Sequence, residues 1–244
     1  MPKITSPGKC RCCGELFDKS RMSTHLKSCA KRIGPTASPK PRGARSFHLV
    51  VEARYNPHYW LHLEVPATAR FGDLDRVLRD VWLECCGHMS AFRFPRPRVP
   101  FRASGTVAQL LAAAAAHSFE DEMDDEQRLM GVPVGKRLQP GAKLEYEYDF
   151  GSTTELSLRV VGEWLSPLAK SRIRVLARNE PPDIRCTRCK KPATQICTEC
   201  ECQGDGALCE TCAANHECGE KMFLPIVNSP RTGVCGYCGP SVEP

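Results

Sequence analysis

The stretch LEYEYDFGSTTELSLRVVG, residues 144–162, carries the clearest structural pattern in the middle of this chain. Apolar residues occupy every second position in two runs on either side of a glycine turn, first Leu144, Tyr146, Tyr148 and Phe150, then Leu156, Leu158, Val160 and Gly162. Such alternation places one set of side chains on a buried face and predicts two half-buried strands that pair with each other.

The residues around this hairpin complete an α+β pattern. A second hairpin is predicted where alternation over 47–55 and 59–65 flanks an Asn56-Pro57 turn. Between the two hairpins, apolar residues at helical spacing over 74–82 predict an amphipathic helix, with Asp73 near its start. The further predicted elements are a strand at Phe92 and Phe94, helices over 107–116 and 120–130, and a closing strand over 173–177. We expect residues 46–180 to form a compact mixed-sheet α+β domain.

Composition excludes several classes of protein. Apolar residues make up 41% and charged residues 25% of the 244 residues, so wholesale disorder is excluded. The longest apolar stretch, 107–117, is interrupted by Gln109 and is too short to span a bilayer. No apolar leader resembles a signal peptide, so we expect a soluble cytoplasmic protein without a membrane partner.

The positive charge of the chain is confined to its N-terminal end. Residues 1–45 have a net charge of +9, residues 46–177 of −1, and residues 178–244 of −2. Residues 33–45 have the Pro, Gly and Lys/Arg content of a basic linker. A basic arm on a near-neutral body indicates an anionic partner, most often nucleic acid, although a solvated leader has the same composition.

The first cysteines form a predicted zinc finger in residues 1–32. The spacing Cys10-x2-Cys13-x11-His25-x3-Cys29 supplies three thiolates and one imidazole, the ligand types that tetrahedral zinc requires. The segment resembles the Cys-Cys-His-Cys variant of the familiar zinc finger. That resemblance implies base contacts from Asp18, Ser20, Arg21 and Thr24. The residues expected to hold phosphates are Lys19, Arg21, Lys27, Lys31 and Arg32. A finger that contacts protein or caps the N-terminus is the alternative.

The C-terminal residues 181–244 predict a double-zinc module. With no secretory signal, regular Cys-x2-Cys pairs favour metal sites over disulfides. The predicted ligands are Cys186, Cys189, Cys197, Cys200, Cys209, Cys212, His216, Cys218 and Cys235. In a cross-braced arrangement, the first and third Cys-x2-Cys pairs hold one ion, and the second pair holds the other ion together with His216 and a late cysteine. The alternative is sequential pairing, in which the first and second pairs share one ion. Cys218, Cys235 and Cys238 compete for the last place. Together with the finger, the chain is expected to bind about three Zn²⁺ ions.

Two further groups of side chains have residue types that bind metal ions, but their patterns are less specific. Glu145, Glu147 and Asp149 stand at alternate positions of one predicted strand and would hold a hard cation for phosphodiester chemistry if they converged. An ordinary solvated strand face has the same pattern, and we favour it. Cys85, Cys86 and His88 are three soft ligands within four residues, but a helix C-terminus capped by Gly87 explains them as well.

Several stretches also resemble a known family. They are ECCGHMSAF (residues 84–92), YEYDFGSTTEL (146–156), LARNEPP (176–182) and HECGEKMFLPIVNSPRTGVCGYCG (216–239). Together they are similar to the plasmid pRiA4b ORF-3-like family, associated with mobile elements as a passenger protein. The resemblance implies a compact α+β domain with a mixed sheet and at least two helices. It also favours Cys235 over Cys238 as a ligand, because Cys238 is often replaced in members with such a tail.

The chain departs from that family after the central strand. Many members continue with an acidic residue, a tryptophan and a histidine, where this chain has Ser152, Thr154 and Leu156. We therefore expect a zinc-binding, non-enzymatic protein that binds nucleic acid through its basic finger arm, or acts as a regulator, while its body and tail contact a protein partner. A metal-dependent nuclease or phosphoryl-transfer enzyme and a protein–protein adaptor are the alternatives.

Overall fold

The computed structural model describes residues 6–33, 43–95, 128–166 and 172–240 of the chain. The predicted helix over 107–116 lies outside these residues. Of the predicted helix over 120–130, only residues 128–130 are described, and they are helical.

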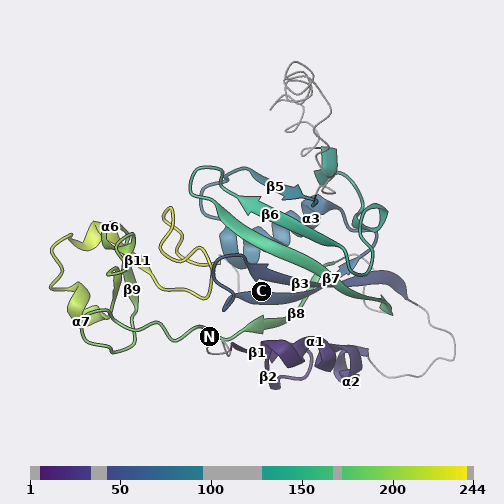
Figure 1. The fold of residues 1–244 in the computed structure, drawn as a ribbon, viewed down its shortest axis with the longest axis horizontal. Coiled ribbons are helices and arrows are strands. Elements are labelled where there is room, and N and C mark those ends of the chain that lie inside the picture. Colours follow the sequence, from purple (N-terminus) through teal and green to yellow (C-terminus); the bar gives the residue numbers. More distant parts are fainter. Residues whose placement is uncertain (1–5, 34–42, 96–127, 167–171, 241–244) are drawn as a thin grey trace, which may run out of the picture.

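The fold is built on one eight-stranded sheet with the strand order β2-β1-β8-β4-β3-β7-β6-β5 (Figure 1). Its strands are β1 (Pro7–Cys10), β2 (Leu16–Asp18), β3 (Ala44–Ala53), β4 (Trp60–Pro66), β5 (Ser90–Arg93), β6 (Lys143–Tyr148), β7 (Thr154–Ser166) and β8 (Arg174–Asn179). Every pairing between these strands is antiparallel, so the predicted mixed sheet is wrong. Short turns join β3 to β4 and β6 to β7, and a tight turn permits only antiparallel pairing.

One face of the sheet packs against a helical segment. This segment starts as α3 (Phe71–Leu78) and continues as a π-helix, η1 (Arg79–Leu83). Asp73 lies in its first turn, near the helix start as the sequence predicts, and its Oδ2 accepts a hydrogen bond of 2.8 Å from the Arg70 backbone N–H. Fully buried side chains at the centre of this core include Leu61, Leu63 and Val65 on β4, Tyr146 and Tyr148 on β6, and Leu74, Leu78 and Trp82 on the helix.

The N-terminal segment, which the sequence predicts to be a finger, covers part of the opposite face of the sheet. Its helices are α1 (Lys19–Ser28) and α2 (Ala30–Ile33), which lie across the sheet from α3 (Figure 1). Met22 and Leu26 of α1 are fully buried and belong to one apolar cluster with Trp60, Leu176 and Ala177. Strand β1 pairs with β8, so the finger extends the central sheet. A finger this small buries little apolar surface by itself, and it shares its core with the sheet instead.

A polar group is buried on this same face. Trp60, His62 and Glu64 alternate along β4 and therefore point to one side of the sheet. His48 Nε2 lies 2.7 Å from His62 Nδ1. Glu64 accepts a hydrogen bond of 2.6 Å from Trp164 Nε1 and forms an ion pair with Arg174.

The C-terminal cysteines fold into a second, smaller unit that projects from one end of the sheet (Figure 1). Its elements are β9 (Gln195–Cys197), α6 (Thr198–Glu201), β10 (Ala207–Leu208), α7 (Glu210–Ala213), η3 (Glu220–Met222) and β11 (Phe223–Pro225), and its strand order is β10-β9-β11. A short 3₁₀ helix, η2 (Val134–Lys136), belongs to the central domain.

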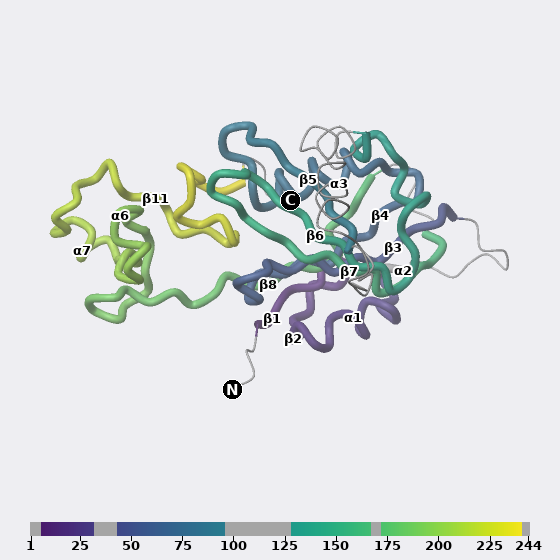
Figure 2. Tube along the Cα trace, turned by 45° about the horizontal axis from the view of Figure 1, so that its top comes forward, coloured from purple at the N-terminus to yellow at the C-terminus, as the bar shows by residue number. Residues whose placement is uncertain are grey.

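After β11 the chain turns back to the central domain. We call residues 226–240 the return segment; it is yellow in Figures 1 and 2 and lies in both views beside the end of the sheet where β6 joins β7. Ser229 Oγ donates a hydrogen bond of 2.6 Å to the Trp82 carbonyl, and Tyr237 is fully buried. The residues predicted to form one tail module therefore belong to two places, because the return segment packs on the central domain.

Among the described residues, no helix combines the length and the apolar character needed to cross a membrane.

Candidate metal centres

Four groups of cysteine and histidine side chains converge in the described part of the chain. Within each group, the four ligand atoms all lie within 4.8 Å of one another. The groups are Cys10, Cys13, His25 and Cys29; Cys186, Cys189, Cys209 and Cys212; Cys197, Cys200, His216 and Cys218; and Cys85, Cys86, His88 and Cys235. Each of these four groups could hold a metal ion.

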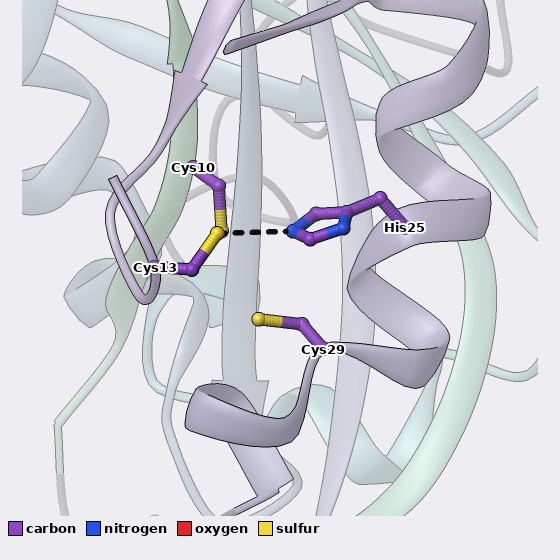
Figure 3. A group of neighbouring side chains, drawn as sticks. All are labelled: Cys10, Cys13, His25 and Cys29. Carbon is purple, nitrogen blue, oxygen red and sulfur yellow. Dashed lines mark hydrogen bonds between the residues drawn. The ribbon is translucent and has the colours of Figure 1, made fainter. Parts of the chain in front are cut away.

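The first group closes the finger between a strand end and a helix. Figure 3 shows Cys10 and Cys13 facing His25 and Cys29 across a common centre. Cys13 Sγ lies 3.4 Å from His25 Nε2. The Phe17 ring stacks on the His25 ring with centroids 3.9 Å apart, which fixes the plane of the imidazole. Helical spacing brings His25 and Cys29 to the same face of α1, since residues four apart are neighbours on a helix.

Burial shapes the acidity of this finger site. It raises the pKa of the fully buried Cys10 thiol to about 12. A thiol with this pKa keeps its proton at neutral pH unless a cation replaces it, because a lone thiolate is costly to bury. Metal binding at the finger therefore releases protons and depends on pH.

The C-terminal unit holds two interleaved groups. Cys186 and Cys189 meet Cys209 and Cys212, with Cys189 Sγ and Cys209 Sγ 3.5 Å apart. The intervening pair, Cys197 and Cys200, meets His216 and Cys218 instead. Cys200 Sγ lies 3.4 Å from His216 Nε2 and 3.7 Å from Cys218 Sγ. The structure thus has the cross-braced order, and Cys218 takes the last place.

Neighbouring thiols in the first of these groups differ widely in acidity. Burial opposes ionisation of Cys186, but hydrogen bonds from the backbone N–H groups of Cys189 and Cys209 outweigh it and lower the pKa of Cys186 to about 6. Hydrogen bonds with Cys189 and Cys209 raise the pKa of Cys212 to about 12. One thiol therefore ionises readily while its neighbour retains a proton, as expected where several thiols lie close together and each thiolate disfavours the ionisation of the next.

The fourth group corrects the prediction for Cys235. The sequence places Cys235 among the tail ligands, whereas the structure places it beside Cys85, Cys86 and His88, with Cys235 Sγ 3.2 Å from His88 Nε2. Gly87 does adopt a left-handed φ of 71° after the helix. The sequence signal was the Cys-Cys-x-His run, but nothing in it revealed a partner 147 residues away. In the described residues, Cys12, Cys202 and Cys238 belong to none of the four groups.

The acidic strand face does not converge on a cation site. Glu145 pairs with Arg54 at 2.8 Å, Glu147 with Arg93 at 3.0 Å, and Asp149 with Arg231 at 2.6 Å. Asp149 has a φ of 65°, so it leaves the alternation of β6 and turns its carboxylate inward, where it is 6% exposed. The three carboxylates predicted to share a face are therefore split, and each is held by a different guanidinium.

The residues predicted to contact nucleic acid differ in their surroundings. Arg21, Lys27 and Lys31 are exposed. Lys19 is engaged within the protein, since its Nζ lies 3.3 Å from Glu52 and donates a hydrogen bond of 2.9 Å to the Pro57 carbonyl. The side chain of Arg32 lies outside the described residues. A hollow of about 310 Å³ on α1 is lined by Phe17, Ser20, Arg21, Thr24, His25 and Ser28.

Comparisons with known proteins leave the family open. No family model matches the sequence, and no curated protein matches it either. One solved structure similar to this chain is that of MM3350 from Methanosarcina mazei Go1, a protein of unknown function. The two chains share 16% sequence identity, with a TM-score of 0.38, over 56% of this chain and 70% of the other.

Proposed function

We propose that this chain is a non-enzymatic zinc-binding protein that contacts nucleic acid through its finger. The observation that carries the proposal is the closure of the finger and of both cross-braced groups by four cysteine or histidine ligands each. A site with four protein ligands leaves no open position for a substrate or a reactive water, as is typical of structural zinc.

The distances support zinc in particular. In a tetrahedral zinc site with bonds of about 2.3 Å to sulfur and about 2.0 Å to nitrogen, neighbouring ligand atoms stand roughly 3.5–3.8 Å apart. The separations of 3.4 Å between Cys13 and His25, and of 3.7 Å between Cys200 and Cys218, are close to that value. Sulfur-rich tetrahedral sites select zinc over the hard cations magnesium and calcium.

Metal content tests the zinc part of the proposal. Native mass spectrometry of the full chain, with elemental analysis, should show that His25→Ala and Cys200→Ser each lose one zinc ion relative to the parent chain. Cys202→Ser is the matched control, because Cys202 is exposed and lies in none of the four groups, and it should retain the full content. A parent chain without zinc would refute the proposal.

The exposed face of α1 supports contact with nucleic acid. Ser20, Arg21 and Thr24, three of the four residues that the finger resemblance assigns to base contacts, are exposed and line the hollow on this helix. Met22 and Leu26 point the other way, into the sheet. The helix therefore presents a polar, basic face to solvent while its apolar face fixes its orientation.

Charge reversal tests this part better than truncation, because removing residues 1–45 would also remove strands β1 and β2 from the sheet. We expect Arg21→Glu/Lys31→Glu to weaken binding to duplex DNA and to single-stranded RNA in fluorescence anisotropy. The slope of log K against log salt should fall in magnitude by about 2, or about 1 for each lost phosphate contact.

The control carries the same change in net charge elsewhere. Lys136 and Lys143 are exposed on the central domain, so Lys136→Glu/Lys143→Glu should leave the salt slope of the parent protein unchanged. An equal loss in both variants would mean that only net charge matters. If the parent protein fails to bind either nucleic acid at low salt, the finger is a structural cap on the sheet. The burial of Met22 and Leu26 against the sheet is compatible with that role as well.

A further inference from the structure

The fourth group of ligands joins two distant parts of the chain. Cys85, Cys86 and His88 lie in the loop after η1, and Cys235 lies in the return segment. The other three groups each close one local unit, whereas this group brings together the central domain and the C-terminal residues that return to it.

The loop that carries three of these ligands is held independently of any ion. Arg79 Nη2 donates a hydrogen bond of 2.7 Å to the His88 carbonyl, and its Nη1 pairs with Glu84 at 2.8 Å. The second oxygen of Glu84 accepts a hydrogen bond of 2.6 Å from the Gly87 backbone N–H. These contacts tie both ends of the loop to the helix, so its ligands are positioned in advance.

The return segment is anchored just as firmly. Arg231 is fully buried, and its guanidinium donates hydrogen bonds to Asp149 at 2.6 Å, and to the Ser152 carbonyl and Thr154 Oγ1 at 3.0 Å. The same guanidinium lies over the Tyr148 ring, 4.8 Å from its centroid. Four residues later the chain reaches Cys235, which has a left-handed φ of 49°. The anchored guanidinium therefore fixes where the Cys235 thiol can lie.

A carboxylate lies near the histidine of this group. His88 Nδ1 lies 3.7 Å from Asp149 Oδ1, while its Nε2 faces Cys235 Sγ at 3.2 Å. Metal-binding histidines commonly direct their second ring nitrogen toward a carboxylate, which fixes the tautomer and strengthens the ligand. Asp149 thus lies near His88 while it accepts the hydrogen bond from Arg231, so the ligand and the anchor share one carboxylate neighbour.

We propose that Cys85, Cys86, His88 and Cys235 form a fourth zinc site that fastens the return segment to the central domain. Three thiolates and one imidazole form the same donor set as in the finger, and tetrahedral sets of this kind favour zinc. The site is more accessible than the others, since Cys86 and Cys235 are exposed and the His88 side chain is 30% exposed. It goes beyond the proposed function, because it requires neither nucleic-acid binding nor the cross-braced groups.

Thiol labelling of the full-length wild-type protein tests the site directly. In zinc-saturated buffer, N-ethylmaleimide followed by peptide mapping should label Cys86 and Cys235 at least tenfold more slowly than the exposed Cys202 and Cys238, which belong to none of the four groups. A zinc chelator should abolish that difference. Equal labelling of all four residues in zinc-saturated protein would overturn the proposal.

Metal counting supplies the second readout. Native mass spectrometry should find four zinc ions in the parent chain and in Cys238→Ser, but three in Cys235→Ser and in His88→Ala. Hydrogen exchange should then rise over residues 226–240 and stay unchanged over the finger. Three ions in the parent chain and in Cys235→Ser alike would overturn the fourth site while leaving the proposed function intact. If Cys235→Ser fails to fold, the labelling of the wild-type protein still decides.

Discussion

At the scale of single residues, the buried histidine pair couples stability to pH. His48 is fully buried and His62 is 1% exposed, and their ring nitrogens lie 2.7 Å apart. Burial lowers the pKa of His62 well below its usual value, and the nearby charges of His48, Arg159 and Lys19 lower it further. His62 therefore stays neutral in the fold at a pH at which the unfolded chain takes up a proton.

The sign of the pH effect follows from this difference. Below pH ~6.5 the unfolded state binds the additional proton, so the free energy of unfolding falls as the pH falls, by up to about 1.4 kcal/mol per pH unit from this group. We expect His62→Gln to flatten the dependence between pH 7.5 and 5.5 in urea unfolding with excess zinc. His58→Gln is the control, since His58 is only half-buried, and an identical slope in all three proteins would contradict the prediction.

At the scale of the element, strand β1 explains why the finger cannot be separated from the sheet. Gly8 pairs with Asn179 of β8, and a Cβ at this position would lie 2.3 Å from the Trp60 ring and 2.5 Å from the Arg178 carbonyl. The glycine is required here for close approach, because any side chain would push β1 away from both the indole and the neighbouring strand.

A pair of glycine substitutions tests this packing. Gly8→Ala should lower the free energy of unfolding by about 1–3 kcal/mol, the usual cost of overpacking, and should loosen the finger. Gly162→Ala in β7 is the control, since its added Cβ would meet only the His48 Cβ at 4.0 Å, and it should be neutral or stabilising. Urea unfolding measures both, and hydrogen exchange over β1 locates the change. Equal effects of the two substitutions would refute the argument.

Within the described residues, the sequence predicted the two hairpins and the helix of the central domain because each carries its own periodicity. The hairpin over 144–162 corresponds to β6 and β7, and the helix over 74–82 to α3 with η1. The cysteine spacings likewise indicated three of the four ligand groups, since those ligands repeat at short intervals. Periodicity carries no information about which distant segments meet. Pairing of β1 with β8, and the approach of Cys235 to His88, depend on tertiary packing and could not be predicted from spacing.

At the scale of the whole molecule, metal binding would sharpen the charge asymmetry of the chain. The formal charge of +6 counts every thiol as neutral, whereas zinc-bound thiolates are ionised. A site with three thiolates and one histidine carries −1 and a site with four thiolates carries −2. If all four proposed sites are filled, residues 1–45 have a charge of about +8 and the remainder about −7. Any attraction to nucleic acid then belongs to the finger arm alone.

The order of strands in the sheet has a consequence for self-association. The sheet ends in two short strands, β2 with three residues and β5 with four, and short edge strands resist pairing with another molecule. Behind β2 and β1 lies the longer strand β8, with Leu176 and Ala177 facing the finger. The finger therefore covers the edge of β8, whose backbone groups would otherwise be free to pair with another molecule.

Loss of metal from the finger should uncover that edge. A chelator should then produce dimers in light scattering, reversed by added zinc, and His25→Ala should associate even with zinc present. Cys235→Ser is the comparison, because its substitution leaves β1 on β8, and it should remain monodisperse if the parent protein is. An unchanged size distribution after chelation would contradict the prediction. Without metal at the finger, the chain would then pair with a second copy through the backbone groups of its own sheet edge.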